Sequence, residues 1–158
     1  MTDSIDSRVP SSPVRLRPAV PIFRVRDLEV SIDYYVERLG FQLQWRDDPL
    51  ASVGRDRTSI MLSEGDQGQP GTWVWISAGN VDELYNELRE RGARLRHPPT
   101  NYPWESRECQ VTDPDGHVLR FAAELTEGEP LGEWLDGSGT RWMPQPDGTW
   151  RALDIEHS

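Results

Sequence analysis

The chain of 158 residues contains no lysine, and all 17 of its basic residues are arginine. Without lysine there is no Schiff-base amine, no anchor for pyridoxal phosphate and no P-loop lysine, so the enzyme classes that need one are excluded. Cys109 is the only cysteine, which excludes an intrachain disulfide and a cysteine cluster for zinc. We expect its thiol to be packed and unreactive rather than a nucleophile.

Long apolar runs and an excess of positive charge are also absent. The first twenty residues carry Asp3, Asp6 and Arg8 with several prolines instead of the apolar core of a signal peptide, and no apolar run reaches transmembrane length. The formal net charge of −10 argues against binding to nucleic acid or to an anionic membrane surface. We therefore expect a cytoplasmic protein that binds neither nucleic acid nor membrane.

Composition divides the chain into three parts. Residues 1–17 are rich in Ser, Pro and Arg without apolar periodicity, which predicts a disordered or loosely ordered arm. Residues 125–158 form an acidic, Trp-rich C-terminal extension in which Trp134, Trp142 and Trp150 recur eight residues apart between turn signals. This spacing favours a small hairpin or meander that covers the flank of the domain, a partner subunit or the mouth of a groove.

The part between them, 18–124, shows an internal duplication. Gly40 ends one helical pattern and Gly92 ends another, and Gln44 and Arg96 follow at the same offset. The pattern predicts an α+β domain of two βαβββ modules, about 18–64 and 71–124. The expected elements are strands at 19–25, 41–45, 50–55, 57–63, 73–76, 108–112 and 117–123, and helices over 28–39 after Asp27 and from 81 after Asn80.

The duplication also predicts which positions are equivalent. With both helices on one side, the opposite concave faces of the sheets are free to line a shared groove. Val20 is then paired with Trp73, and Met61 with Arg120, and we expect these four side chains to converge near a pseudo-twofold axis. The turn at 113–116 precedes a strand that points Arg120 inward, where we expect it to pair with Glu64 or Glu108.

These features occur together with several short motifs in a fixed order. The chain resembles the vicinal oxygen chelate superfamily of glyoxalases, bleomycin resistance proteins and dioxygenases, and within it most closely the bleomycin resistance proteins. The landmarks are Ala19-Val20-Pro21, Arg26-Asp27, Arg38-Leu39-Gly40-Phe41, Trp73-Val74-Trp75, Asp82-Glu83-Leu84-Tyr85, Pro103-Trp104, Arg107-Glu108 and Asp113-Pro114.

The resemblance implies a fold with four places from which metal-dependent members take His, Glu or Gln ligands. Here these places hold Val20, Met61, Trp73 and Arg120, none of which suits a divalent metal. The three histidines, His97, His117 and His157, share neither a strand face nor helical spacing. We therefore expect no metal, no cofactor and no catalytic residue.

The resemblance implies instead a homodimer that captures a drug unchanged in a groove between subunits, and so confers resistance to a bleomycin-family antibiotic. Stacking aromatics would hold a planar group of a bleomycin-like glycopeptide or another natural product, and acids such as Asp47, Asp48, Glu64 and Glu105 would serve a cationic end. The candidate ligand-binding residues are Trp45, Asp48, Met61, Trp73, Trp75, Trp104 and Arg120.

Alternatives remain at this level. The loop Pro103-Trp104-Glu105-Ser106 has one residue more than in the resistance proteins, and Pro49 and Leu50 also depart from their pattern, so a ligand other than bleomycin is an open alternative. A lyase or isomerase of the same superfamily, with non-standard or no metal ligands, could use Glu108, Glu64 or His97. A ligand sensor whose tail docks on another protein is a third possibility. Trp73, Trp75 and Met61 could also be core residues.

Overall fold

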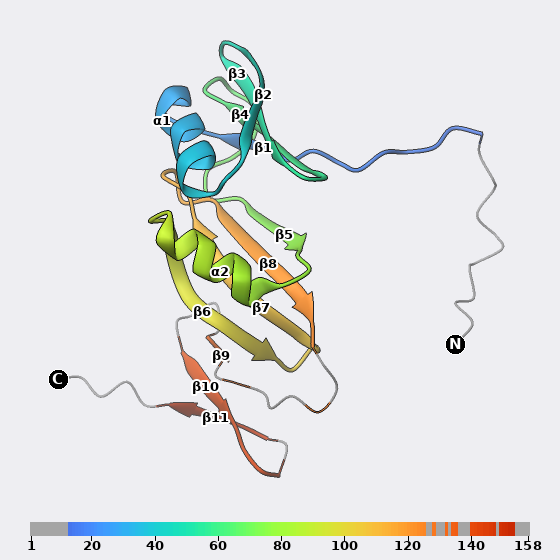
Figure 1. Cartoon of the computed structure of the whole chain (residues 1–158), viewed down its shortest axis with the longest axis vertical. Coiled ribbons are helices and arrows are strands. Elements are labelled where there is room, and N and C mark those ends of the chain that lie inside the picture. The colour runs from blue at the N-terminus through green and yellow to red at the C-terminus, as the bar shows by residue number, and fades with distance from the viewer. Residues whose placement is uncertain are drawn as a thin grey trace.

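A computed structural model describes residues 13–125, 128, 132, 134–135, 140–147 and 149–153. Most of the predicted N-terminal arm lies outside the described residues. Its remainder and the residues up to position 20 are exposed and form no regular secondary structure, with Val14 and Leu16 open to solvent. In Figure 1 this segment extends away from the body of the molecule. No helix within the described part of the chain is long and apolar enough to cross a membrane.

The two βαβββ modules predicted from the sequence are present. The first comprises β1 (Ile22–Arg24), α1 (Leu28–Asp33), a π-helical turn η1 (Tyr34–Arg38), β2 (Gln42–Asp47), β3 (Leu50–Arg55) and β4 (Thr58–Ser63). The second comprises β5 (Trp73–Ser77), α2 (Val81–Glu90), β6 (Arg94–Tyr102), β7 (Ser106–Thr112) and β8 (Val118–Glu124). Their sheets have matching orders, β1-β4-β3-β2 and β5-β8-β7-β6, each with one parallel pair.

The capping residues and glycines in the sequence predicted where the helices begin and end. The side chain of Asp27 accepts from the backbone N–H of Val30 at 3.1 Å, and that of Asn80 accepts from Glu83 at 3.1 Å. Gly40 and Gly92 follow the helices with φ of 71° and 78°, a left-handed conformation that glycine adopts without steric cost.

Two predicted elements differ from the structure. The strand expected at 19–25 begins only at Ile22, because Pro18 and Pro21 have no backbone N–H to donate to a sheet. The helix expected over 28–39 ends as α1 and continues as the wider turn η1. There Tyr34 donates to the Thr112 carbonyl at 2.6 Å and Tyr35 to the Asp113 carboxylate at 3.0 Å. These bonds to the second module hold both tyrosines inward.

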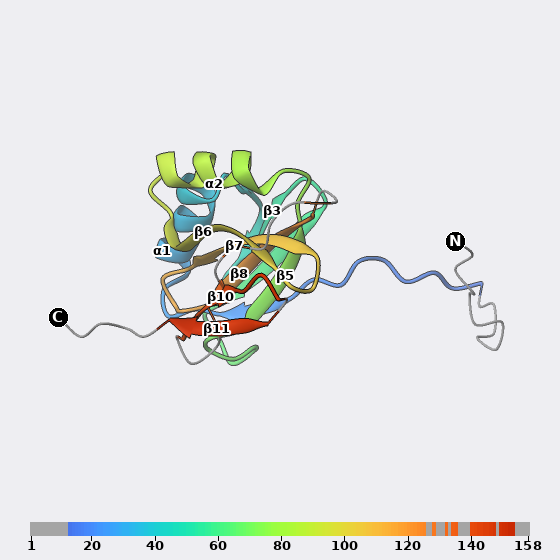
Figure 2. The same ribbon diagram turned by 90° about the horizontal axis from the view of Figure 1, so that it is seen from below.

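Both helices lie on one side of the molecule (Figure 2). Buried apolar side chains from the helices and both sheets form the core. His117, which is fully buried, connects the modules. Its Nδ1 accepts from the Thr72 N–H at 2.9 Å, and its Nε2 lies 2.6 Å from the Arg24 carbonyl, so Nε2 carries the proton. The ring also stacks on Phe23, with centroids 4.3 Å apart. The opposite faces of the sheets are left uncovered by the helices.

The C-terminal extension forms the predicted meander. Strands β9 (Trp134–Leu135), β10 (Arg141–Pro144) and β11 (Trp150–Leu153) make an antiparallel sheet of order β11-β10-β9. It lies beside β6, where the N–H of Gly132 donates to the Asn101 carbonyl at 3.3 Å (Figure 1).

Candidate functional site

The open face of the second sheet carries large aromatic side chains. Along β5, Val74 and Ile76 pack on the core, whereas Trp73 and Trp75 point the other way and are 52% and 56% exposed. Trp104, from the loop between β6 and β7, is also exposed and stacks on Tyr102 with ring centroids 4.6 Å apart. The alternative that these indoles belong to the core of the chain is therefore wrong.

Arg120 lies next to Trp75 in the register of β5 and β8, and it pairs with Glu108, one of its two predicted partners. Its Nη2 and Nε donate to Glu108 Oε2 at 2.6 and 3.0 Å. The other oxygen, Oε1, accepts from the Trp104 indole at 2.8 Å and from the Ser106 hydroxyl at 2.9 Å. Trp75 Nε1 makes a longer contact with the same oxygen at 3.5 Å.

Glu108 is therefore the centre of the site. Its side chain is fully buried, yet both oxygens have donors. Burial raises the pKa of a carboxyl group, but the hydrogen bonds from Trp104, Arg120 and Ser106 outweigh that effect and hold the pKa of Glu108 below its usual value. An ionised Glu108 keeps the Arg120 guanidinium and the Trp104 indole in fixed orientations. Both oxygens of Glu108 are thus occupied as hydrogen-bond acceptors, which leaves neither of them placed to exchange a proton with a ligand.

A hollow of about 550 Å³ lies between Trp75 and Trp104. Ser77, Ser106 and Ala122 also line it, with Glu105 and Glu124 among its charged residues. Its size lies in the range of small-molecule sites. In the loop that is one residue longer than expected, Glu105 has φ of 61°, a left-handed conformation that is uncommon for residues other than glycine.

Cys109 follows Glu108 but faces the core. It is fully buried, and burial raises the pKa of its thiol to about 12, as expected for a packed cysteine. Burial and the nearby charge of Glu108 likewise raise the pKa of the Tyr102 hydroxyl to about 12. Neither group titrates near neutral pH.

One contributor to the site was not among the candidates. Arg96 lies at a break in the register between β6 and β7, where Leu95 pairs with Val111 and His97 with Gln110. Leu95 packs against the core, so alternation along β6 directs Arg96 to the opposite, open face. The guanidinium of Arg96 lies over the Trp73 ring, 5.0 Å from its centroid. The same irregularity occurs in β2 at Gln44, the residue that the duplication matched with Arg96.

The first sheet presents a second open face. Trp45, Ser52, Met61 and Ile22 form one row across its strands, and Trp45 is 43% exposed. Gln44 accepts from the Ser52 hydroxyl at 2.7 Å and donates to the Ser59 hydroxyl at 3.0 Å. The residues of this row are uncharged, and Met61 occupies the place that Arg120 has in the second sheet.

Two of the predicted acids are occupied elsewhere. Asp48 accepts from Arg46 at 2.7 Å in the turn between β2 and β3, and Arg46 also pairs with Glu29 on α1. Glu64 accepts from the backbone N–H of Leu28 at 2.9 Å at the start of α1. Asp48 as a ligand-binding residue stays a prediction; in this structure its carboxylate is paired with Arg46 and its side chain is largely exposed.

The seven candidate residues fall into separate groups. Trp73, Trp75, Trp104 and Arg120 share the face of the second sheet, Trp45 and Met61 share that of the first, and Asp48 belongs to neither. Val20 precedes β1 on the first sheet. The four side chains that were expected to converge therefore come from two different sheets: Val20 and Met61 from the first, Trp73 and Arg120 from the second. In Figure 1 the two sheets lie one after the other along the long axis of the molecule.

The side chains at the four positions that the resemblance equates with metal-ligand places are poor ligands for a divalent metal. Met61 offers only a thioether, Val20 offers no donor atom, and Arg120 brings a positive charge that Glu108 already neutralises. In the part of the chain that the structure describes, no group of three His, Cys, Asp or Glu residues is arranged to hold a metal ion.

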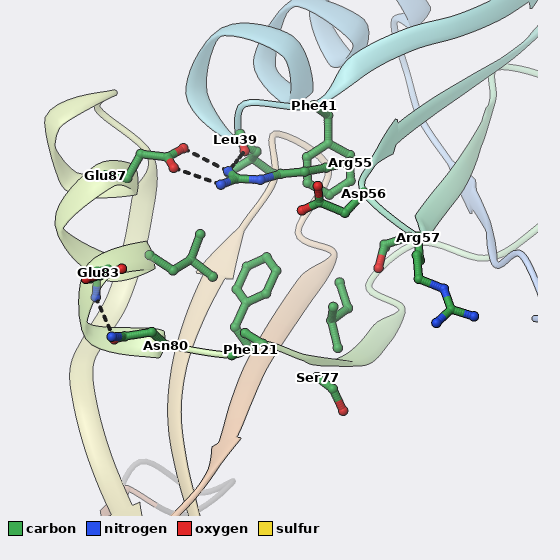
Figure 3. A pocket seen from close by; sticks show the side chains of 15 residues that line it. Leu39, Phe41, Arg55, Asp56, Arg57, Ser77, Asn80, Glu83, Glu87 and Phe121 are labelled. Atoms are coloured by element: carbon green, nitrogen blue, oxygen red, sulfur yellow. Dashed lines mark hydrogen bonds and ion pairs between the residues drawn. The ribbon is translucent and has the colours of Figure 1, made fainter.

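A second hollow, of about 440 Å³, lies on the helix side between the modules (Figure 3). Leu39, Phe41 and Phe121 line its apolar part. Its main polar groups bind each other: Arg55 donates to both oxygens of Glu87 at 2.8 Å and to the Leu39 carbonyl at 3.1 Å. We interpret this ion pair as a connection between the modules rather than a binding site.

Comparison with known proteins gives concordant results. Residues 17–121 match the family model described as the Glyoxalase/Bleomycin resistance protein/Dioxygenase superfamily. A bleomycin resistance protein of Geobacillus stearothermophilus is 26% identical over 135 residues, which cover 68% of this chain and 96% of the relative. Bleomycin resistance proteins of Staphylococcus aureus match equally well.

Solved structures have the same fold. The crystal structure of a bleomycin-binding protein complexed with bleomycin superposes with a TM-score of 0.61 at 22% identity, covering 69% of this chain and 99% of the other. A glyoxalase/bleomycin resistance protein/dioxygenase from Nocardioides gives a TM-score of 0.58 at 24% identity and covers 75% and 91% of the two chains.

Proposed function

The chain belongs to the Glyoxalase/Bleomycin resistance protein/Dioxygenase superfamily, and on that premise we propose that it binds and sequesters a bulky, planar natural product without altering it. A bleomycin-family antibiotic is the first ligand to test. The observation that carries this proposal is the open aromatic face of the second sheet, where Trp75 and Trp104 flank a hollow and are oriented by the buried carboxylate of Glu108.

Aromatic faces held in this way suit capture. An indole stacks on a planar ring or attracts a cation with about 0.5–2 kcal/mol per good contact. Because Glu108 fixes Trp104 and Arg120 before a ligand arrives, little conformational freedom is lost on binding. The same hydrogen bonds occupy Glu108, which is one of the acids that a catalytic role would need free. Sequestration is therefore favoured over acid–base catalysis.

We further propose that the protein acts as a homodimer. Trp45 and Leu43 on β2 and Trp73 and Trp75 on β5 are each more than two-fifths exposed. Exposed large apolar side chains at this density mark an interaction surface. A dimer would set the open face of one chain against that of another and bring the Met61 and Arg120 positions near each other. Sedimentation equilibrium tests this, and a monomer at micromolar concentration would contradict it.

The ligand proposal is tested by titrating tryptophan fluorescence with metal-free and copper-bound bleomycin. We expect saturable quenching with wild-type protein and about tenfold weaker binding when Trp75 is replaced with leucine. Tyr85→Leu is a matched control, because Tyr85 also carries a guanidinium over its ring, that of Arg89, but lies on α2. Absence of quenching, or equal losses in the two variants, would contradict the proposal.

A further inference from the structure

One end of the open face of the second sheet carries two arginines, whereas acids were expected from the sequence to contact the ligand. The acids expected to serve a cationic ligand include Asp48 and Glu64, and both are engaged on the helix side. Two guanidinium groups instead lie against exposed indoles: Arg96 over Trp73 at 5.0 Å, and Arg120 beside Trp104 at 5.9 Å. The end of the face between Trp73 and Trp104 is therefore supplied with N–H donors and positive charge.

Arg120 is oriented so that one edge remains available. Its Nε and Nη2 donate to Glu108, and among the described residues Nη1 has no hydrogen-bond partner. The side chain is 29% exposed, so this edge is open to a ligand. A guanidinium that is held on two sides and open on the third presents its donors in a fixed direction, which suits a planar oxyanion.

Arg96 adds a charge that nothing described neutralises. It is exposed, it lies over the Trp73 ring, and among the described residues it forms no ion pair with a carboxylate. Glu108 balances Arg120, so that pair is neutral, and among the described residues Arg96 is the positive charge at this end without an ion-pair partner. The overall charge of −10 does not cancel it, because at physiological salt the Debye length is about 8 Å.

We infer that this face binds a planar aromatic ligand that carries an acidic group, with the ring between the indoles and the carboxylate or similar oxyanion at Arg96 and Arg120. The inference rests on the proposed function and names the chemical class of its ligand. Glu105 and Glu124 line the hollow between Trp75 and Trp104, which leaves the arginine end as the place for the acid.

The test uses two probes of one shape and different charge, 2-naphthoate and 2-naphthamide, in tryptophan-quenching titrations. We expect wild-type protein to bind the acid about tenfold more tightly than the amide, as a charge-assisted hydrogen bond supplies. Arg96→Gln and Arg120→Gln should each remove most of that preference, so that the acid and the amide bind each variant with affinities within about twofold of one another.

Arg89→Gln is the matched control, because Arg89 also lies over an aromatic ring but on α2. If Arg120→Gln disturbs folding through Glu108, the Arg96→Gln variant still decides the matter. Equal affinity for acid and amide in wild-type protein, no binding of either probe, or a preference that persists in Arg96→Gln would overturn the inference. If bleomycin still binds saturably to the same protein, the proposed function holds although this inference fails. If bleomycin does not bind, the proposed function is contradicted as well.

Discussion

Replacing Glu108 with alanine tests whether this carboxylate organises the site. The side chain is fully buried and accepts short hydrogen bonds from Trp104, Ser106 and, twice, from Arg120. The substitution leaves a guanidinium and two further donors without their acceptor. Removing one member of a buried ion pair costs about 3–5 kcal/mol, but Arg120 is partly exposed and water can reach it, so we expect about 3 kcal/mol.

Urea unfolding followed by circular dichroism measures this loss without depending on the indoles that the substitution disturbs. Asp82→Asn is the matched control. Asp82 also accepts two hydrogen bonds from an arginine, Arg107, at 2.7 and 2.8 Å, but its side chain is 55% exposed. A surface pair of this kind contributes less than about 1 kcal/mol. If Glu108→Ala and Asp82→Asn lower the free energy of unfolding by similar amounts, Glu108 is not the centre of the site.

Three further predictions follow from the same contacts. The pKa of Glu108 is lowered in the folded protein, so its stabilising effect is present above its ordinary pKa of about 4.5 and is lost as the pH falls through the lowered value. The difference in unfolding free energy between wild type and Glu108→Gln should therefore shrink in acid. A difference that grows in acid would contradict this. Glu105 has φ of 61°, a conformation that glycine adopts without steric cost. Glu105→Gly should therefore raise the free energy of unfolding by about 0.5–1 kcal/mol, measured by urea unfolding. His117→Ala leaves the Thr72 N–H and the Arg24 carbonyl unpaired and should cost at least about 3 kcal/mol by urea unfolding; a loss under 1 kcal/mol would refute its connecting role.

Features of the fold that depend on neighbouring residues in sequence could be predicted from it. Asp27 and Asn80 begin helices because their side chains accept from N–H groups three residues on, and Gly40 and Gly92 end them because of their positive φ. The two modules follow from these signals and their constant offset. The π-helical turn could not be predicted in this way, since it depends on bonds from Tyr34 and Tyr35 to residues about eighty positions away.

The site was predicted in part for the same reason. Alternation along β5 and β8 placed Trp75 and Arg120 on one face, but the choice between Glu64 and Glu108 as the partner of Arg120 required the register of β7 against β8. Ser106 lies two residues before Glu108, so strand alternation could have identified it. Arg96 follows Leu95, which packs against the core, so strand alternation could also have assigned Arg96 to the open face.

The two open faces use different chemistry at equivalent positions. Met61 and Arg120 each lie beside the first strand of their module, next to Ile22 and Trp75 respectively. Met61 has a flexible, polarisable side chain that can adjust to many shapes, whereas Arg120 is held by a buried carboxylate in one orientation. A ligand that contacted both faces would therefore be oriented by the second sheet and accommodated by the first. Under the proposed function, we therefore expect substitutions at Arg120 to change which ligand charge is accepted, and substitutions at Met61 to change which ligand size is accepted, both measured by tryptophan-quenching titrations.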